Sequence, residues 1–282
     1  PTRIPSSAAS DVYKRQILRV KEFILNHLMN RINKVFQKDG TIMSIYFTAG
    51  FPAKNDTLSI IKELDSAGVE MIEIGLPFSD PLADGPTIQN SSTIALKNGM
   101  NTIILFEQLK NLRKMTDVPV VIMGYFNPIL QFGIEKFCES CKEVGIDGLI
   151  IPDLPVDIYN DKYQKIFKSY GLLNMFLITP QTSEKRIKYI DGISEGFIYM
   201  VSSYNVTGAI KSFDSFQKKY FKRINEMNLT SPLLVGFGIS NKNTFIDAGK
   251  YSRGAIIGSA YINWISEKGI FKTSEFIKSL RD

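Results

Sequence analysis

The chain has 282 residues, of which 44% are hydrophobic and 22% are charged, and these values are ordinary for a globular protein. The length suits one α/β barrel or two smaller domains. No apolar run approaches the roughly 18 residues that cross a bilayer, and residues 1–16 lack the apolar core of a secretory signal. The net charge of +6 comes without a run of Lys and Arg interleaved with aromatic residues. We therefore expect no membrane and no nucleic-acid partner.

Histidine and cysteine are scarce, which narrows the possible chemistry. His27 is the only histidine and lies near the amino terminus, so Ser-His and Cys-His nucleophilic pairs are excluded from the rest of the chain. Zinc is disfavoured for the same reason, and we expect no metal. Cys138 and Cys141 form a CxxC pair, but apolar residues at helical spacing surround them, so we interpret them as helix residues. The low cysteine content suits the cytoplasm, and acid–base chemistry falls to carboxylates, Lys or Tyr.

The first 28 residues differ in pattern from the rest of the chain. Residues 1–16 show no hydrophobic periodicity, whereas residues 17–28 could form an amphipathic helix. Met29 is a better candidate for a natural start than Pro1. We interpret residues 1–28 as an amino-terminal extension, non-native or disordered or helical, and residues 29–282 as one catalytic domain.

After Met29, short apolar runs rich in β-branched residues alternate with longer amphipathic segments. The predicted strands cover residues 42–48, 70–76, 119–125, 147–153, 174–180, 196–202, 232–238 and 254–260. Helical patterns lie between them, for example at 56–68, 134–145 and 215–228. Two helices, at 85–98 and 102–114, follow the second strand, so we expect one extra helix there.

The strands are apolar almost throughout, which indicates a sheet buried on both faces. Eight strand–helix units in about 250 residues fit a closed barrel better than an open doubly wound sheet. The predicted fold class is therefore α/β, a single-domain (β/α)8 TIM barrel with extra helices. In such a barrel, the active site lies where the strands end and the helices begin.

Alternation along the second strand predicts that Glu73 points into the barrel. Met71 and Gly75 share its face, whereas Ile72 and Ile74 would face the helices. An unpaired carboxylate inside a barrel costs free energy as an ion or shifts its pKa upward, so folding alone would not select it. The alternative is a Glu paired with an inward Lys or Arg, and no predicted strand carries one. We interpret Glu73 as catalytic.

The loop at residues 77–90 is dense in turn-forming residues and carries a second carboxylate, Asp84. Asp84 could cap the helix that starts near Pro86, since Asp and Pro favour these two positions. A carboxylate over the barrel mouth could instead accept a hydrogen bond from a substrate N–H. Spacing alone does not decide between these interpretations.

Small residues follow the last three strands, at 206–209, 236–240 and 258–260. Glycine permits close backbone approach to a ligand, and N–H groups at helix amino ends bind phosphate. Barrels commonly bind phosphate after strands seven and eight with a short extra helix, for which residues 259–262 are a candidate. Each glycine alone could be a plain turn residue, but their convergence favours a phosphate site.

Four aromatic residues lie near predicted strand ends: Tyr46, Tyr125, Tyr199 and Phe237. They could form the walls of a pocket for a flat aromatic ligand. Core packing is the default interpretation of each one, and the sequence pattern leaves both open.

Taken together, these segments resemble the tryptophan synthase alpha family. The stretch IEIGLPFSDPLADGPTIQNSS, at residues 72–92, matches the best-known motif of that family nearly without change. Further matches are FTAGFP at 47–52, IMGYFNPI at 122–129, GLIIPDLP at 148–155, LITPQT at 177–182, VGFGIS at 235–240 and GAIIGSA at 254–260. The resemblance runs from about Met29 to Asp282.

The resemblance implies a lyase of L-tryptophan biosynthesis that cleaves indole-3-glycerol phosphate to indole and glyceraldehyde 3-phosphate. It implies that Glu73 is the general acid–base residue and that Asp84 holds the indole N–H, and neither role needs a cofactor in this chain. The implied phosphate-binding residues are Gly208, Gly238, Gly258 and Ser259. The implied substrate-pocket residues are Tyr46, Thr48, Met123, Tyr125, Tyr199 and Phe237.

The resemblance also implies a partner, a pyridoxal-phosphate beta subunit in an alpha2-beta2 heterotetramer, with Asp80, Pro81 and Asn127 near the shared surface. One departure lies in the loop after strand six. The family usually reads Gly-Val-Thr-Gly there, whereas this chain has Tyr204-Asn205 before Val-Thr-Gly. Asn tolerates positive φ, so the turn can survive, but a bulky Tyr204 could alter loop closure or coupling to the partner.

Two other functions are less consistent with the sequence. An indole-3-glycerol phosphate synthase usually needs a catalytic Lys inside the barrel, and no predicted strand carries one. A non-catalytic partner subunit would be expected to lose Glu73 or Asp84, and both are present.

Overall fold

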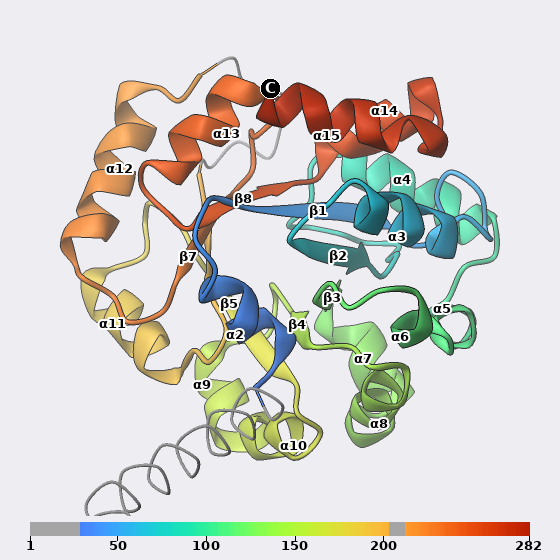
Figure 1. Ribbon diagram of the computed structural model, residues 1–282. Coiled ribbons are helices and arrows are strands. Elements are labelled where there is room, and N and C mark those ends of the chain that lie inside the picture. The colour runs from blue at the N-terminus through green and yellow to red at the C-terminus, as the bar shows by residue number, and fades with distance from the viewer. Residues whose placement is uncertain (1–28, 203–211) are drawn as a thin grey trace, which may run out of the picture.

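The computed structural model describes residues 29–202 and 212–282. The predicted extension, Gly208 and the Tyr204-Asn205 departure lie outside the described residues. Eight parallel strands pair in chain order, and β8 pairs with β1 to close the barrel, with helices packed around it (Figure 1). The predicted TIM-barrel fold is confirmed. Among the described residues, no helix is both long and apolar enough to span a membrane.

Each strand is followed by at least one helix. The strands are β1 (Ile42–Thr48), β2 (Met71–Gly75), β3 (Val120–Met123), β4 (Gly148–Ile150), β5 (Leu173–Ile178), β6 (Ile198–Val201), β7 (Leu233–Gly236) and β8 (Gly254–Ile257). The helices up to β4 are α2 (Arg31–Phe36), α3 (Thr57–Ser66), α4 (Pro86–Lys97), α5 (Thr102–Leu109), α6 (Leu112–Met115), α7 (Phe126–Phe132) and α8 (Ile134–Val144). After β4 come α9 (Val156–Ile158), the π-helix η1 (Tyr159–Tyr163), α10 (Gln164–Ser169), α11 (Glu184–Ile193), α12 (Ser215–Glu226), α13 (Lys242–Gly249), α14 (Ser259–Lys268), the 3-10 helix η2 (Ile270–Lys272) and α15 (Thr273–Arg281).

Helix ends follow local sequence signals. Asp214 and Gln217 form a reciprocal capping box at the start of α12, which satisfies backbone N–H groups that would otherwise have no partner. Gly145 ends α8 in the left-handed region, with φ of 84°, where a residue with a Cβ would be strained. Pro86 occupies the first turn of α4, where its missing N–H costs nothing.

The predicted single helix over 102–114 is wrong, because the chain forms α5 and α6 instead. Asn111 leaves helical geometry, with φ of −108° and ψ of 15°, and this break separates the two helices. The predicted strand at 147–153 also shrinks to β4. Asp147 lies before β4, where its side chain is engaged in ion pairs, and Pro152 after it has no N–H for the ladder.

The two cysteines lie on α8, as predicted, and both side chains are fully buried. Burial raises the pKa of Cys138 to about 12 and that of Cys141 well above its ordinary value. Because the thiolate is the reactive form, neither thiol is a nucleophile at neutral pH, and both act as core residues.

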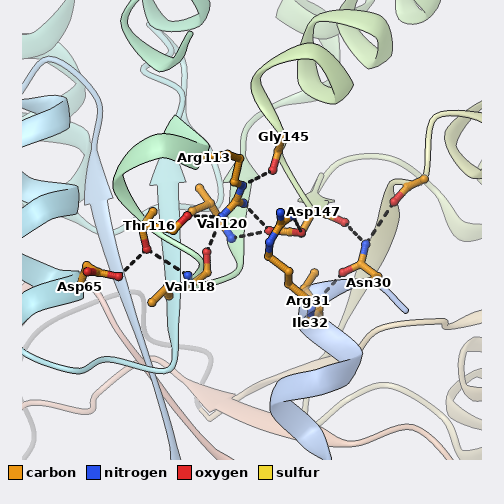
Figure 2. Close-up of polar contacts among 11 residues, drawn as sticks. Asn30, Arg31, Ile32, Asp65, Arg113, Thr116, Val118, Val120, Gly145 and Asp147 are labelled. Carbon is orange, nitrogen blue, oxygen red and sulfur yellow. Dashed lines mark hydrogen bonds and ion pairs between the residues drawn. The ribbon is translucent and has the colours of Figure 1, made fainter. Parts of the chain in front are cut away.

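An ion-pair network around Asp147 joins α2 to the amino ends of β3 and β4 (Figure 2). The Asp147 carboxylate contacts Arg31 at 3.0 Å and Arg113 at 2.6 Å, and it accepts the Val120 N–H at 2.8 Å. Asn30 donates to the Asp147 carbonyl at 2.8 Å. Asp147 is only 3% exposed, and a buried charge is tolerated when it is paired and fully hydrogen-bonded. This network holds the end of the barrel opposite the expected active site.

Candidate active site

Glu73 lies fully buried on β2, where both neighbours in the strand, Ile72 and Ile74, are also fully buried. The Ser44 hydroxyl on β1 donates to its Oε1 at 2.7 Å, whereas its Oε2 has no hydrogen-bond partner among the described residues. Burial raises the pKa of Glu73 to about 7, and the Ser44 bond partly offsets this effect. A carboxyl group with a pKa near neutrality can both accept and return a proton.

Two tyrosines lie inside the barrel against glycines of neighbouring strands. A Cβ added to Gly75 on β2 would stand 2.0 Å from the Tyr46 hydroxyl, and one added to Gly236 on β7 would stand 2.2 Å from the Tyr199 hydroxyl. These glycines therefore make room for the rings. Burial raises the pKa of both phenols, and the charges of Glu73 and Asp84 raise it further. Both phenols are therefore neutral near pH 7, and the charges of both carboxyl groups act on each of them.

Asp84 lies in the loop between β2 and α4. The residue that caps α4 is Gly85, with no side-chain capping bond, so the interpretation of Asp84 as the helix cap is wrong. Instead, the Tyr125 hydroxyl donates to Asp84 Oδ2 at 3.1 Å and accepts the Ala83 N–H at 2.8 Å. Burial raises the pKa of Asp84 to about 6, partly offset by the Tyr125 bond.

Tyr125, two residues after the end of β3, organises the loop that carries Asp84. Its ring stacks on Phe78 with centroids 5.1 Å apart and an interplanar angle of 30°, while its hydroxyl bonds Ala83 and Asp84. Stacking and two hydrogen bonds from one side chain hold both ends of the segment Phe78 to Asp84. Met123, the last residue of β3, lies two positions before Tyr125 and is also buried.

A chain of hydroxyl groups connects β1 to α4. Ser91 donates to the Ile88 carbonyl at 2.8 Å and lies 2.6 Å from the Thr48 hydroxyl, which in turn lies 3.5 Å from the Tyr46 hydroxyl. Since Ser91 uses its proton on the carbonyl, Thr48 donates to Ser91, and the Tyr46 hydroxyl makes a longer contact with Thr48. The hydroxyl of Thr48, a residue predicted to lie near substrate, thus bonds to Ser91 on α4 and contacts Tyr46.

The predicted phosphate residues within the described ranges lie after β7 and β8. Phe237 and Gly238 have consecutive positive φ angles of 67° and 79°. The Ser202 hydroxyl donates to the Phe237 carbonyl at 2.6 Å and so holds this unusual turn. α14 begins at Ser259 directly after Gly258, and the first N–H groups of a helix have no partner within it. These positions can present backbone donors to an anion.

The residues predicted to face a partner lie at the same end of the barrel as the carboxylates. Asp80 and Asn127 are exposed and Pro81 is half-buried. Leu82 beside them is 92% exposed, and Leu130 on the same helix as Asn127 is 45% exposed. Single exposed apolar side chains are common on protein surfaces, so these two residues alone do not define a contact surface.

Within the part of the chain that the structure describes, no group of three or more His, Cys, Asp or Glu side chains could hold a metal ion.

Three hydroxyl residues at the site escaped the sequence analysis: Ser44, Ser91 and Ser202. A signal for the first was present, because Ser44, Tyr46 and Thr48 alternate along a strand whose other residues are apolar. Residues with a period of two share one face, so this face of β1 is polar and belongs to the site. The other two serines have no such signal: Ser202 bonds a backbone carbonyl, and Ser91 bonds a backbone carbonyl and Thr48, which is distant in the sequence.

The fold and site define a class of protein, a TIM-barrel enzyme with one fully buried and one half-buried carboxyl group, both of raised pKa, toward the carboxyl ends of its strands. Comparison with known proteins narrows this class. The sequence profile of the family described as tryptophan synthase alpha chain matches residues 32–280. The chain therefore belongs to the tryptophan synthase alpha chain family. It is a lyase subunit that cleaves indole-3-glycerol phosphate to indole and glyceraldehyde 3-phosphate in tryptophan biosynthesis, as the motifs predicted.

Individual relatives agree with this assignment. The tryptophan synthase alpha chain of Flavobacterium psychrophilum is 61% identical over 252 residues, which covers 89% of this chain and 100% of the relative. That of Bacteroides thetaiotaomicron is 52% identical and covers 89% and 100%. Among solved structures, the alpha chain from Legionella pneumophila has a TM-score of 0.81 at 31% identity, covering 90% of this chain and 96% of that one. The A-subunit from Pyrococcus furiosus has a TM-score of 0.77 at 35% identity, covering 86% and 98%.

Proposed function

We propose that Glu73 and Asp84 together carry the cleavage reaction of this lyase. The observation that supports this most directly is the state of Glu73: it is fully buried, one oxygen is held by Ser44, the other has no partner among the described residues, and its pKa is about 7. Perturbed carboxyl groups with an open oxygen mark acid–base sites.

In this proposal, Glu73 removes the proton from the hydroxyl of the glycerol side chain next to the indole ring. A proton is added at C3 of the ring, with the help of the same residue. The carbon–carbon bond between ring and side chain then breaks, and the hydroxyl carbon becomes the aldehyde of glyceraldehyde 3-phosphate. The electron pair of the broken bond stays with the ring and restores the aromatic indole. Proton removal and proton return balance, so the reaction needs no oxidant and no cofactor in this chain.

Asp84 accepts the indole N–H and stabilises the positive charge that develops on the protonated ring. The ring lies between Tyr46, Tyr125, Tyr199 and Phe237, with Thr48 and Met123 behind them. The phosphate is bound by backbone N–H groups of Gly208, Gly238 and Gly258 and by Ser259. The left-handed turn at Phe237-Gly238 and the start of α14 at Ser259 support this assignment.

The partner in this proposal is a beta subunit that carries pyridoxal phosphate, in an alpha2-beta2 heterotetramer in the cytoplasm. The exposed segment around Asp80, Pro81 and Leu82, together with Asn127, supports a contact at the barrel mouth. Residues 29–282 form the catalytic domain, and the profile match over residues 32–280 supports that boundary.

The test measures indole release from indole-3-glycerol phosphate by the purified chain, with beta subunit present, for wild type, Glu73→Gln and Glu139→Gln. Glu139 is an exposed residue on α8 and serves as a matched control. Wild type and the control should release indole, whereas Glu73→Gln should release almost none while circular dichroism shows an intact fold. A Glu73→Gln variant that keeps its turnover would remove Glu73 from the mechanism.

A further inference from the structure

Ser44 is a buried polar residue inside the barrel and bonds directly to the Glu73 carboxylate. It lies on β1, fully buried, and its hydroxyl donates to Glu73 Oε1 at 2.7 Å. The strand register pairs Ser44 with Met71 and Tyr46 with Glu73. The Glu73 side chain therefore bonds diagonally to Ser44, two residues before its register partner Tyr46 on β1. A buried hydroxyl costs free energy unless it is bonded, and here its proton goes to the carboxylate.

The other hydroxyl groups on this face are committed elsewhere. Thr48 donates to Ser91, and the Tyr46 hydroxyl contacts Thr48 at 3.5 Å. Ser44 is thus the residue of β1 that can hold the carboxylate. The second carboxylate oxygen, Oε2, is buried without a hydrogen-bond partner among the described residues.

We propose that Ser44 is a positioning residue that anchors Oε1 of Glu73, so that Oε2 is the oxygen that exchanges protons with the substrate. This inference rests on the proposed role of Glu73. Anchoring one oxygen limits rotation of the carboxyl group and presents the other oxygen in one orientation, which favours proton transfer along a fixed path.

The Ser44 bond also sets the proton affinity of Glu73. Burial favours the neutral acid, whereas a hydroxyl donor favours the carboxylate, and the pKa of about 7 reflects both. The ionisable groups that interact with Glu73 are Tyr46 on β1 and Tyr199 on β6, and the charge of Asp84, in the loop after β2, acts on the same two phenols. Burial raises the pKa of both phenols, so they stay neutral, which leaves Asp84 as the other group that titrates near neutrality.

The experiment compares wild type with Ser44→Ala, which removes the donor, and Ser44→Cys, which keeps a weak donor of similar size. Ser252→Ala is the control, because Ser252 donates to the Ala248 and Gly254 carbonyls away from Glu73. Glutamate labelled with 13C in its carboxyl carbon reports the titration of Glu73 by NMR, with Glu73→Gln used for assignment. The label excludes Asp84 from the signal.

In Ser44→Ala, the NMR midpoint of Glu73 should move up by about one to two pH units, the loss expected for one hydrogen bond to a charged group. The acidic limb of the pH profile of indole release should move with it. Near neutral pH, kcat should fall about tenfold to a hundredfold while KM changes less than about threefold. Ser44→Cys should show a smaller shift and gives the same test if Ser44→Ala does not fold.

An unmoved NMR midpoint in both serine variants would overturn the inference, as would a pH profile that Ser252→Ala shifts equally. The outcome is separable from the proposed function. If wild type released no indole, the role of Glu73 would fail, whereas the NMR titration would still report whether Ser44 controls its ionisation.

Discussion

Replacing Glu73 by Gln should make folding stability less dependent on pH even as it removes activity. The folded-state pKa of Glu73 is raised from 4.5 to about 7, chiefly by burial. Between these values the folded chain holds a proton that the unfolded chain has released. The stabilising contribution of the protonated carboxyl is therefore fully present below the unfolded pKa and is lost as pH rises through 7.

The magnitude follows from the same shift. At about 1.4 kcal/mol per pKa unit, the rise from 4.5 to about 7 corresponds to a loss of about 3 kcal/mol. Such a loss is a large share of the ~5–15 kcal/mol that holds a typical domain folded. Most of it should appear between about pH 5 and about pH 8. Gln carries no charge at either pH and should not show it.

The assay is urea unfolding at both pH values, followed by circular dichroism, for wild type, Glu73→Gln and Glu139→Gln. The Gln side chain still accepts the Ser44 proton but brings an amide N–H2 that needs a partner, so the variant's absolute stability is not compared with wild type. The quantity compared is the change in unfolding free energy between the two pH values. Wild type and the exposed-site control should lose about 2–3 kcal/mol more than Glu73→Gln. Equal losses in all three proteins would refute the assignment of a strongly raised pKa to this carboxyl.

Three further predictions concern the mouth of the barrel. Asp84→Asn should reduce turnover more than substrate binding, because the charge of Asp84 acts on the protonated ring; equal losses in turnover and in a binding titration would instead give Asp84 a binding role. Tyr125→Phe should lower kcat/KM about tenfold, since it removes the hydrogen bond from Tyr125 to the Asp84 carboxylate, and a bond to a charged group contributes about 1.5–3 kcal/mol. Steady-state kinetics check this, with Tyr251→Phe as the control. Gly75→Ala should destabilise the fold by about 1–3 kcal/mol, because the new methyl overlaps the Tyr46 hydroxyl. A wild-type melting temperature for that variant would contradict the close packing of ring and glycine.

Regular features of the barrel could be predicted from the sequence, because each depends on a periodic pattern. The alternation at residues 71–75 predicted the inward direction of Glu73 from the apolar character of Ile72 and Ile74. The break between α5 and α6 could not be predicted in this way. It depends on a single residue, Asn111, leaving helical geometry inside a segment whose hydrophobic spacing is helical on both sides.

Contacts between distant segments were harder to predict. Asp84 next to Gly85-Pro86 has the local pattern of a helix cap, and local pattern cannot reveal that Tyr125, far along the chain, donates to it. The alternation of Ser44 with Tyr46 and Thr48 indicates a polar face of β1, but it does not show that Ser44 bonds a carboxylate on the neighbouring strand. The resemblance to a known family implied a substrate contact for Asp84, which stays a prediction, and it did not point to Ser44.

The burial of Cys138 and Cys141 makes this chain a convenient starting point for spectroscopic labelling. They are the only cysteines in the sequence, and both are fully buried with raised thiol pKa values. A maleimide dye or nitroxide reacts with exposed thiolates, so a cysteine introduced at exposed Leu82 or Asn127 should be modified selectively in the native protein. A pair of such probes would measure the approach of another subunit to the barrel mouth without first removing the natural thiols.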